Sequence, residues 1–198
     1  LGMDYFVYDF SERFKEEVIE KFIDYYEKGW TPNPCIDCNR FLKFNDLYQW
    51  AKDLDCDYIA TGHYARIEYD KENERYTLLK GPDPKKDQSY VLYSLTQDQL
   101  AHTLFPLGDL EKEEVLRIAE EAGLINAKKH DSQDICFVPD GDYKGFLERF
   151  QDKTYPDGDI VDGSGKVLGR HDGAVGYTIG QRKGLGVAAG HPVYVLDK

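Results

Sequence analysis

The sequence is poor in cysteine and has no long apolar segment. Cysteine accounts for 4 of the 198 residues, too few for a scaffold held together by disulfides. No apolar run approaches the roughly 18 residues that a membrane span requires. The first residues, Leu1–Asp4, have neither the basic start nor the apolar core of a signal peptide. These absences predict a soluble, cytoplasmic protein without a membrane partner.

Several common catalytic signatures are also missing. The sequence contains no HExxH zinc-protease motif and no GxSxG nucleophile elbow. The segment Asp162–Lys166 (DGSGK) resembles a phosphate-binding loop only superficially. It lacks the first glycine at the required distance and a Ser or Thr after the lysine. We interpret it as the turn of a β-hairpin.

The composition is that of a folded, acidic protein. Hydrophobic residues make up 41% and aromatic residues 14%, which excludes a disordered chain. The 25 Lys and Arg residues against 37 Asp and Glu residues give a net charge of −12. This balance argues against non-specific coating of nucleic acid. It does not exclude a local basic surface, because basic residues cluster at 85–86, 128–130, 170–171 and 182–183.

Helical and strand patterns alternate in the first part of the chain. Apolar residues at helical spacing predict a helix from Ser11 to Lys28, capped by Ser11 and ended by Gly29. A proline-rich loop and a second helix follow. The segments Asp4–Phe10 and Asp57–Thr61 are typical of strands. This order indicates an α/β domain with a parallel sheet.

The later segments predict smaller elements. We expect a hairpin over residues 65–79, a capping box at Thr96, a helix over Glu111–Ala122 and another helix near residues 143–150. From about residue 155 glycines are frequent and apolar runs are short, which predicts strands at 159–161, 166–168, 177–179 and 193–196. We place a catalytic-type domain at residues 1–140 and a β-rich domain at residues 141–198.

The pair Cys35-x-x-Cys38 is the sharpest local feature. Two thiols at this spacing can hold a metal ion, form a disulfide, or act as nucleophile and resolving thiol. A structural zinc site usually needs a second pair, so such a site would have to recruit Cys136 and one more ligand. Taken alone, Cys136 between Ile and Phe is more typical of a buried core residue, and Cys56 also reads as structural.

Two further segments have the composition of binding loops. Thr61–Tyr64 (TGHY) follows a predicted strand, where ligands bind in parallel sheets, and Gly62 would allow a close approach to the backbone. An ordinary turn is the alternative. Lys86–Tyr90 (KDQSY) combines a cation, an acid and an amide, and its alternative is a helix start capped by Asp87.

Five motifs in one order resemble the tRNA-specific 2-thiouridylase (MnmA) family, and the resemblance covers nearly the whole chain. The motifs are Thr31–Asn39 (TPNPCIDCN), Ala60–Ala65 (ATGHYA), Lys86–Tyr90 (KDQSY), Asp131–Phe137 (DSQDICF) and Tyr177–Gly186 (YTIGQRKGLG). The resemblance implies an adenine-nucleotide alpha hydrolase-like parallel-sheet domain followed by a small β-rich central domain.

The resemblance also implies an activity. ATP, with Mg²⁺, would adenylate the C2 oxygen of the wobble uridine in certain tRNAs, and sulfur would then replace that oxygen. Cys136 matches the persulfide carrier, and Cys38 matches the nucleophilic partner, which can end in a disulfide with Cys136. A sulfur-relay protein or a cysteine desulfurase would load the sulfur.

The remaining site residues follow from the same match. Asn33, Pro34 and Cys35 resemble the loop that meets the target base, and Gly62 resembles a nucleotide-contacting position. A loop that contacts tRNA is matched by three consecutive residues: Lys86, Asp87 and Gln88.

The sequence departs from the family pattern at three points. We find neither the family's SGGxDS loop, which binds ATP phosphates, nor its C-terminal β-barrel, and so expect a fragment that is inactive and binds ATP poorly on its own. Many members have Asp where this chain has Cys35. Together, Cys35, Cys38 and Cys136 would allow a [4Fe–4S] cluster with one open iron, so cluster-bound sulfur is an alternative to the persulfide.

Two functions of other classes compete with this interpretation. The first is a metal-binding RNA-interaction module in which Cys136 is inert and distant from the CxxC pair. The second is a thiol–disulfide oxidoreductase, which would need no ATP. Whether Cys38 and Cys136 crosslink or share a metal would distinguish these functions.

Overall fold

The computed structural model describes residues 2–128 and 135–198, and the chain divides into two compact units. Unit 1 comprises Leu1–Val18 and Cys35–Asp131, and unit 2 comprises Ile19–Pro34 and Ser132–Lys198. Residues 19–34 thus group with the C-terminal residues. The domain boundary between residues 140 and 141 stays a prediction.

The predicted first helix is present as three consecutive stretches. These are α1 (Ser11–Phe14), the π-helical η1 (Lys15–Ile19) and α2 (Glu20–Glu27). Gly29 follows with φ +81°, the left-handed conformation that commonly ends a helix. The predicted cap at Ser11 is wrong. Ser11 is already helical, and the side chain of Asp9 accepts its N–H at 2.8 Å.

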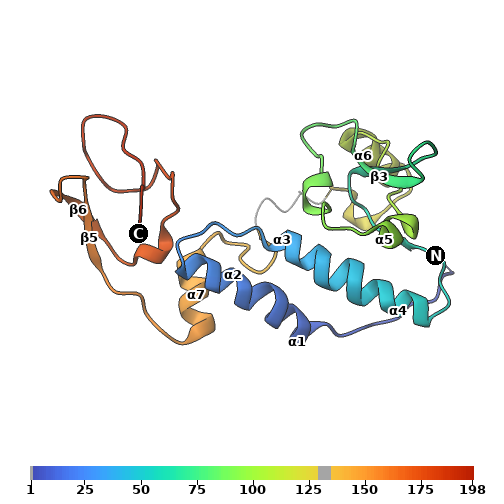
Figure 1. The fold of residues 1–198 in the computed structure, drawn as a ribbon, viewed down its shortest axis with the longest axis horizontal. Helices are drawn as coiled ribbons and strands as arrows, with labels where there is room; N and C mark the ends of the chain where they lie inside the picture. Colours follow the sequence, from blue (N-terminus) through green and yellow to red (C-terminus); the bar gives the residue numbers. More distant parts are fainter. Residues whose placement is uncertain (1, 129–134) are drawn as a thin grey trace. The chain divides into compact units, whose positions relative to one another are not determined.

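The second helix begins earlier than the proline-rich sequence suggests. It consists of α3 (Pro34–Asp37), the π-helical η2 (Cys38–Asp46) and α4 (Leu47–Asp53). Pro34 occupies the first helical position, where its missing N–H costs no hydrogen bond. The loop therefore ends before the CxxC pair, and both cysteines are helical (Figure 1).

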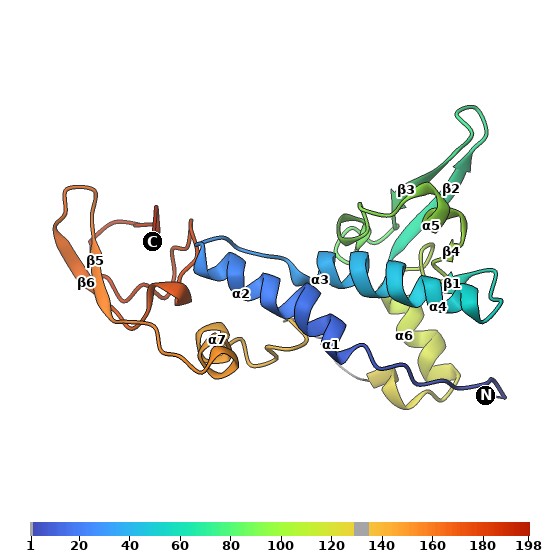
Figure 2. The same ribbon diagram turned by 60° about the horizontal axis from the view of Figure 1, so that its bottom comes forward.

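The sheets of unit 1 are small. Strand β1 (Ile59–Ala60) pairs in parallel with β4 (Thr103–Leu104), and β2 (Ala65–Asp70) forms an antiparallel hairpin with β3 (Arg75–Lys80). Figure 2 shows α5 (Gln97–Ala101) against this hairpin. The predicted α/β class with a parallel sheet and the predicted capping box at Thr96 are confirmed.

Short helices complete unit 1. The elements are η3 (Ser89–Val91), α6 (Lys112–Glu121) and η4 (Ile125–Lys128). The helix predicted over Glu111–Ala122 is thus confirmed, with Gly123 after it at φ +68°. None of the helices among the described residues has the length and apolar character needed to span a bilayer.

A hydrophobic core joins several of the described elements of unit 1. Its buried members come from the second helix, from β1 and β2, and from the segment around η3: Phe44, Tyr48, Ala51, Ile59, Ala65, Val91 and Leu92. Ile36, between the two cysteines, packs against this core. Burial of apolar surface is the main favourable contribution to folding, so these elements are held together strongly.

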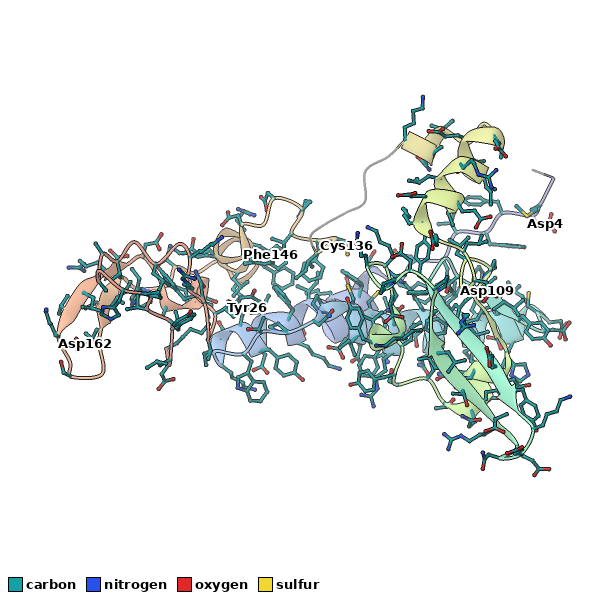
Figure 3. All side chains as sticks on the ribbon, turned by 90° about the horizontal axis from the view of Figure 1, so that it is seen from above. Asp4, Tyr26, Asp109, Cys136, Phe146 and Asp162 are labelled. Carbon is teal, nitrogen blue, oxygen red and sulfur yellow. The ribbon has the colours of Figure 1, made fainter. Side chains whose placement is uncertain are left out.

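Unit 2 has an aromatic core. The elements of unit 2 are α2, α7 (Tyr143–Gln151), the hairpin of β5 (Gly158–Val161) and β6 (Val167–His171), and η5 (Ala174–Gly176). The rings of Tyr26 and Tyr143 stack at 5.8 Å between centroids. Figure 3 labels Tyr26 and Phe146 in this core and Asp162 in the turn of the β5–β6 hairpin, where we predicted a turn.

Three predicted strands do not form. Residues 4–10, 177–179 and 193–196 have no strand ladder in the structure. Side chains at positions 5–8 are exposed, and Tyr8 instead places its ring 5.0 Å from that of Trp50. Val195 exchanges hydrogen bonds with Gly180 and Gln181, but this isolated contact is not extended into a ladder. An apolar run becomes a strand only where it finds a partner strand.

Candidate functional site

The two cysteines of the CxxC pair lie in the first turns of the helix that begins at Pro34. Cys35 is exposed and Cys38 is half-buried. Residues three apart in a helix lie on the same face, so both thiols are presented to one side. Helix N-termini stabilise thiolates, the reactive form of cysteine. The local geometry therefore suits a nucleophile at Cys38 with a second polarisable group at Cys35.

Asn39 follows the pair directly and was missed at the sequence level. Its side chain is 2% exposed, and Nδ2 donates to the carbonyl oxygen of Cys35 at 2.9 Å. Its Oδ1 is buried and has no hydrogen-bond partner among the described residues. Buried amide atoms without a partner are uncommon and costly. Asn39 thus fixes the turn that holds both cysteines while retaining one unused acceptor.

Gly62 lies directly after Thr61, at the carboxyl end of the parallel pair. The N–H of Thr61 donates to the carbonyl oxygen of Leu104 at 3.1 Å, and Gly62 itself is exposed. A Cβ at this position would meet only the side chain of Leu107, at 3.5 Å, which is an ordinary contact. The fold therefore does not demand glycine here, whereas a ligand that approaches the backbone would.

His63 lies in the TGHY segment, but the sequence predicts no role of its own for it. It is 7% exposed, and its Nδ1 lies 2.7 Å from Oγ1 of Thr61. Burial, and to a smaller extent the positive charge of Lys43, lower the pKa of His63 to about 4. The imidazole is therefore neutral near pH 7 and holds the turn around Gly62 in place. The rings of Phe44 and Phe105 lie within 6 Å of it.

The 86–88 loop is tied down by its own side chains. Asp87 accepts the hydroxyl of Ser89 at 2.9 Å and its N–H at 3.3 Å. The N-cap of η3 is Gln88 and has no side-chain cap, so the alternative of a helix start capped by Asp87 is wrong. Gln88 accepts the backbone N–H of Tyr64 at 3.0 Å. Lys86 is half-buried, and its N–H donates to the carbonyl oxygen of Asp83. Contact of these residues with tRNA stays a prediction.

These three segments lie on one core. Phe44 on the cysteine helix, Ala65 after the Gly62 turn and Val91 after the 86–88 loop all belong to the buried cluster of unit 1. No local sequence pattern indicates this shared core, because Cys38, Gly62 and Lys86 follow one another at intervals of 24 residues. Within unit 1 the helix of the CxxC pair, the segment after the Gly62 turn and the segment after the 86–88 loop therefore share one core.

Cys136 belongs to unit 2 and is exposed, so the interpretation of it as a buried core residue is wrong. Its neighbours Ile135 and Phe137 pack against the aromatic core, and Phe137 lies edge-on to Phe22 at 5.2 Å. Figure 3 labels Cys136 together with Tyr26 and Phe146 of the same unit. The flanking residues hold the backbone while the thiol faces outward. The preceding part of this motif, 131–134, lies outside the described residues.

The remaining motif residues, and Cys56, differ in their exposure and local hydrogen bonds. Cys56 is exposed, which does not fit a core role. Pro34 is buried and Asn33 is exposed in the residues just before the CxxC pair. In the last motif, the side chain of Gln181 accepts the N–H of Thr178 and donates to the carbonyl oxygen of Lys183, both at 2.9 Å, which closes a local turn.

No group of three or more His, Cys, Asp or Glu side chains in the described part of the chain is arranged to hold a metal ion. The predicted set of Cys35, Cys38 and Cys136 draws on both units. An iron–sulfur cluster on these residues therefore stays a prediction.

Comparison with known proteins gives two family matches and many relatives. Residues 1–140 match the tRNA methyl transferase HUP domain, and residues 144–198 match the tRNA methyl transferase PRC-barrel domain. The chain is 52% identical over 197 residues to the tRNA-specific 2-thiouridylase MnmA of Clostridioides difficile, and covers 55% of that protein. It is 54% identical over 197 residues to the corresponding protein of Desulforamulus reducens, and covers 54% of it.

A further relative of the same name, MnmA 1 of Caldanaerobacter subterraneus subsp. tengcongensis, is 54% identical over 197 residues, again with 54% of its length covered. The chain thus spans about half the length of the curated relatives it matches. The family models match the chain over most of its length, and the five motifs occur in the order that the resemblance required. The chain belongs to the tRNA-specific 2-thiouridylase family, with its HUP domain and its PRC-barrel domain.

Proposed function

We propose that this protein transfers sulfur to C2 of the wobble uridine of tRNA in a reaction that uses ATP. The observation that supports this most is that unit 1 places the CxxC helix, the Gly62 turn and the 86–88 loop on one buried core. The names of the relatives, tRNA-specific 2-thiouridylase, point to the same reaction. A generic thiol–disulfide oxidoreductase would need only the first of these three segments.

The reaction begins with activation of a poor electrophile. The C2 oxygen of uridine attacks the α-phosphorus of ATP, pyrophosphate leaves, and the adenylated oxygen becomes a good leaving group. ATP acts as a substrate with Mg²⁺ on its phosphates, and the exposed backbone at Gly62 is the proposed contact of this unit with the nucleotide. The target base has to leave its stack to be reached.

Sulfur then enters from a cysteine persulfide on Cys136. The terminal sulfur of the persulfide attacks C2, and AMP leaves with the original oxygen. The thiolate of Cys38 next attacks Sγ of Cys136, which breaks the sulfur–sulfur bond, releases 2-thiouridine and leaves a Cys38–Cys136 disulfide. An external thiol reductant supplies two electrons to restore both thiols. Exposure of Cys136 and the helical position of Cys38 support these roles.

The partners follow from this sequence of steps. A sulfur-relay protein or a cysteine desulfurase loads the persulfide on Cys136, and the protein works where tRNA is found, in the cytoplasm. Asn33, Pro34 and Cys35 are the proposed contacts of the flipped base, because they lie directly before Cys38, at the start of the same helix. Lys86 is the proposed phosphate contact, because lysine binds phosphate as a point charge.

The test is ATP-dependent thiolation of tRNA by the protein at the length its gene encodes. We expect Cys38→Ser and Cys136→Ser each to abolish 2-thiouridine, measured by mass spectrometry of digested tRNA, because neither serine variant can hold or release the sulfur. Cys56→Ser is the matched control and should keep full activity. Full activity of Cys38→Ser would contradict the proposed role of Cys38, and reductase activity without ATP would favour the oxidoreductase.

A further inference from the structure

Gln88 and Tyr64 are joined by two hydrogen bonds. The backbone N–H of Tyr64 donates to Oε1 of Gln88 at 3.0 Å, and the backbone N–H of Gln88 donates to the carbonyl oxygen of Tyr64 at 2.9 Å. One residue thus supplies both a donor and an acceptor to the backbone of a segment 24 residues away. Such a reciprocal pair fixes distance and orientation together.

The two residues sit beside the two proposed ligand contacts. Tyr64 is two residues after Gly62, and Gln88 is two residues after Lys86. On its other side the Gly62 turn is held by the bond between Thr61 and the buried imidazole of His63. A displacement of the 86–88 loop is therefore transmitted to the backbone at Gly62.

The core prevents either segment from relaxing independently. Ala65, which follows Tyr64, is 0% exposed, and Val91, whose N–H donates to the carbonyl oxygen of Gln88, is 4% exposed. Close-packed interiors transmit small shifts rather than absorbing them. The two hydrogen bonds are the direct link between two loops that are otherwise separate in sequence.

We propose that Gln88 is a positioning residue that couples tRNA binding at the 86–88 loop to nucleotide binding at the Gly62 turn. This inference rests on the proposed function, and it replaces a direct tRNA contact of the Gln88 side chain by a link within the chain. Coupling between two ligands is reciprocal, so tRNA tightens the nucleotide and the nucleotide tightens tRNA by the same factor.

The experiment measures this factor in the protein at its native length. The dissociation constant of α,β-methylene ATP, which cannot be cleaved between the α and β phosphates, is determined with and without tRNA that has a wobble uridine. In the unmodified protein we expect tRNA to lower it by about fivefold or more, the range typical of coupled sites. The coupling ratio is the dissociation constant without tRNA divided by that with tRNA. In Gln88→Leu, which has no acceptor for the Tyr64 N–H, this ratio should fall to about one.

Two further variants separate coupling from stability. Gln88→Glu keeps the oxygen that accepts the Tyr64 N–H, so it should restore most of the ratio. Gln97→Leu is the matched control, because Gln97 makes a similar two-bond pair with the backbone of Tyr76, at 2.7 and 2.9 Å. Loss of the two Gln97–Tyr76 hydrogen bonds should lower the stability of the fold and leave the coupling ratio unchanged. If Gln88→Leu does not fold, Gln88→Asn, one methylene shorter, gives the same comparison.

The outcomes separate the possible failures. A ratio of one in the unmodified protein, or an unchanged ratio in Gln88→Leu, would overturn the inference. Weaker tRNA binding in Gln88→Leu with the ratio intact would return Gln88 to the role of a direct tRNA contact. If the unmodified protein binds neither nucleotide nor tRNA, the proposed function itself has failed. This outcome differs from failure of the Gln88 inference alone, in which both ligands bind but the ratio is one.

Discussion

The side-chain amide of Asn39 donates to the carbonyl oxygen of Cys35 at 2.9 Å, inside the helix that presents the CxxC pair. The helix changes to π register at Cys38, and such a change alters which amide each carbonyl meets. At Cys35 the side chain of Asn39 is a donor to the carbonyl oxygen. π-Helical segments are frequent at functional sites, and here the segment begins at the proposed nucleophile.

Removal of this amide should be costly. We expect Asn39→Ala to lower the free energy of unfolding by about 1–3 kcal/mol, because the hydrogen bond from the Asn39 side chain to the carbonyl of Cys35 is lost and a buried space is left. Urea denaturation measures the loss. Asn45→Ala on the same helix is the control, since Asn45 is exposed and should change the stability by less than about 0.5 kcal/mol. Equal stability of the two variants would contradict the role of Asn39.

The glycines of unit 1 allow ligand approach to be tested separately from folding. Gly62→Ala should leave stability nearly unchanged, because a Cβ there meets one side-chain atom at 3.5 Å. It should weaken nucleotide binding if the nucleotide approaches this backbone. Gly108→Ala is the opposite case, since its Cβ would lie 2.1 Å from the carbonyl oxygen of Ala65 and should destabilise the fold. Thermal unfolding and nucleotide titration of both variants check the two expectations, and unchanged nucleotide affinity in Gly62→Ala would remove Gly62 from the site.

The stability of the chain should depend on pH through His63. The pKa of His63 is lowered from 6.5 to about 4 in the folded state, so between these values the unfolded chain binds the additional proton. The stabilisation is complete above pH 6.5 and is lost as the pH falls through 4, with a total of at most about 3 kcal/mol.

Urea midpoints at pH 7.5 and pH 5 measure this dependence. In His63→Gln the midpoints should differ less between the two pH values than in the unmodified chain. His191→Gln, at an exposed histidine, should keep the full difference. If both variants behave alike, the dependence on pH comes from other groups.

How far the sequence determines the fold can be seen at particular residues. The helix from Ser11 and its end at Gly29 were predictable, because helical periodicity and the glycine after the last turn are local signals. The capping box at Thr96 was predictable for the same reason. Residues 4–10 were predicted wrongly as a strand, because an apolar run does not specify a partner strand.

The site was predictable in its motifs but not in its supporting contacts. The motif positions Cys38, Gly62 and Cys136 come from the resemblance, and their roles stay predictions. The bonds of Asn39 and Gln88 depend on the π register of one helix and on the packing of two distant loops. No local pattern encodes such contacts, which arise only when the core of unit 1 forms.

The iron and sulfide content of the protein distinguishes a persulfide route from cluster-bound sulfur. On the persulfide route we expect anaerobically purified protein to lack stoichiometric iron, and Cys35→Asp to retain most of its thiolation activity, because Cys35 then only orients the base. Iron and acid-labile sulfide near about four each, lost in Cys35→Ala, would instead establish a cluster. Metal and sulfide analysis with an absorption spectrum distinguishes the two outcomes, and zinc on Cys35 and Cys38 alone would favour the RNA-interaction module.

The packing of Phe137 against Phe22 determines which substitutions outside the cysteines should abolish activity. The exposed thiol of Cys136 keeps its direction only because the aromatic residues beside and beneath it hold the backbone. Substitution of either ring should therefore displace the Cys136 thiol and lower thiolation activity even where the protein still folds. In a random-mutagenesis screen scored on tRNA thiolation, substitutions at Phe22 and Phe137 should be recovered together with the cysteines, although neither ring has a reactive atom.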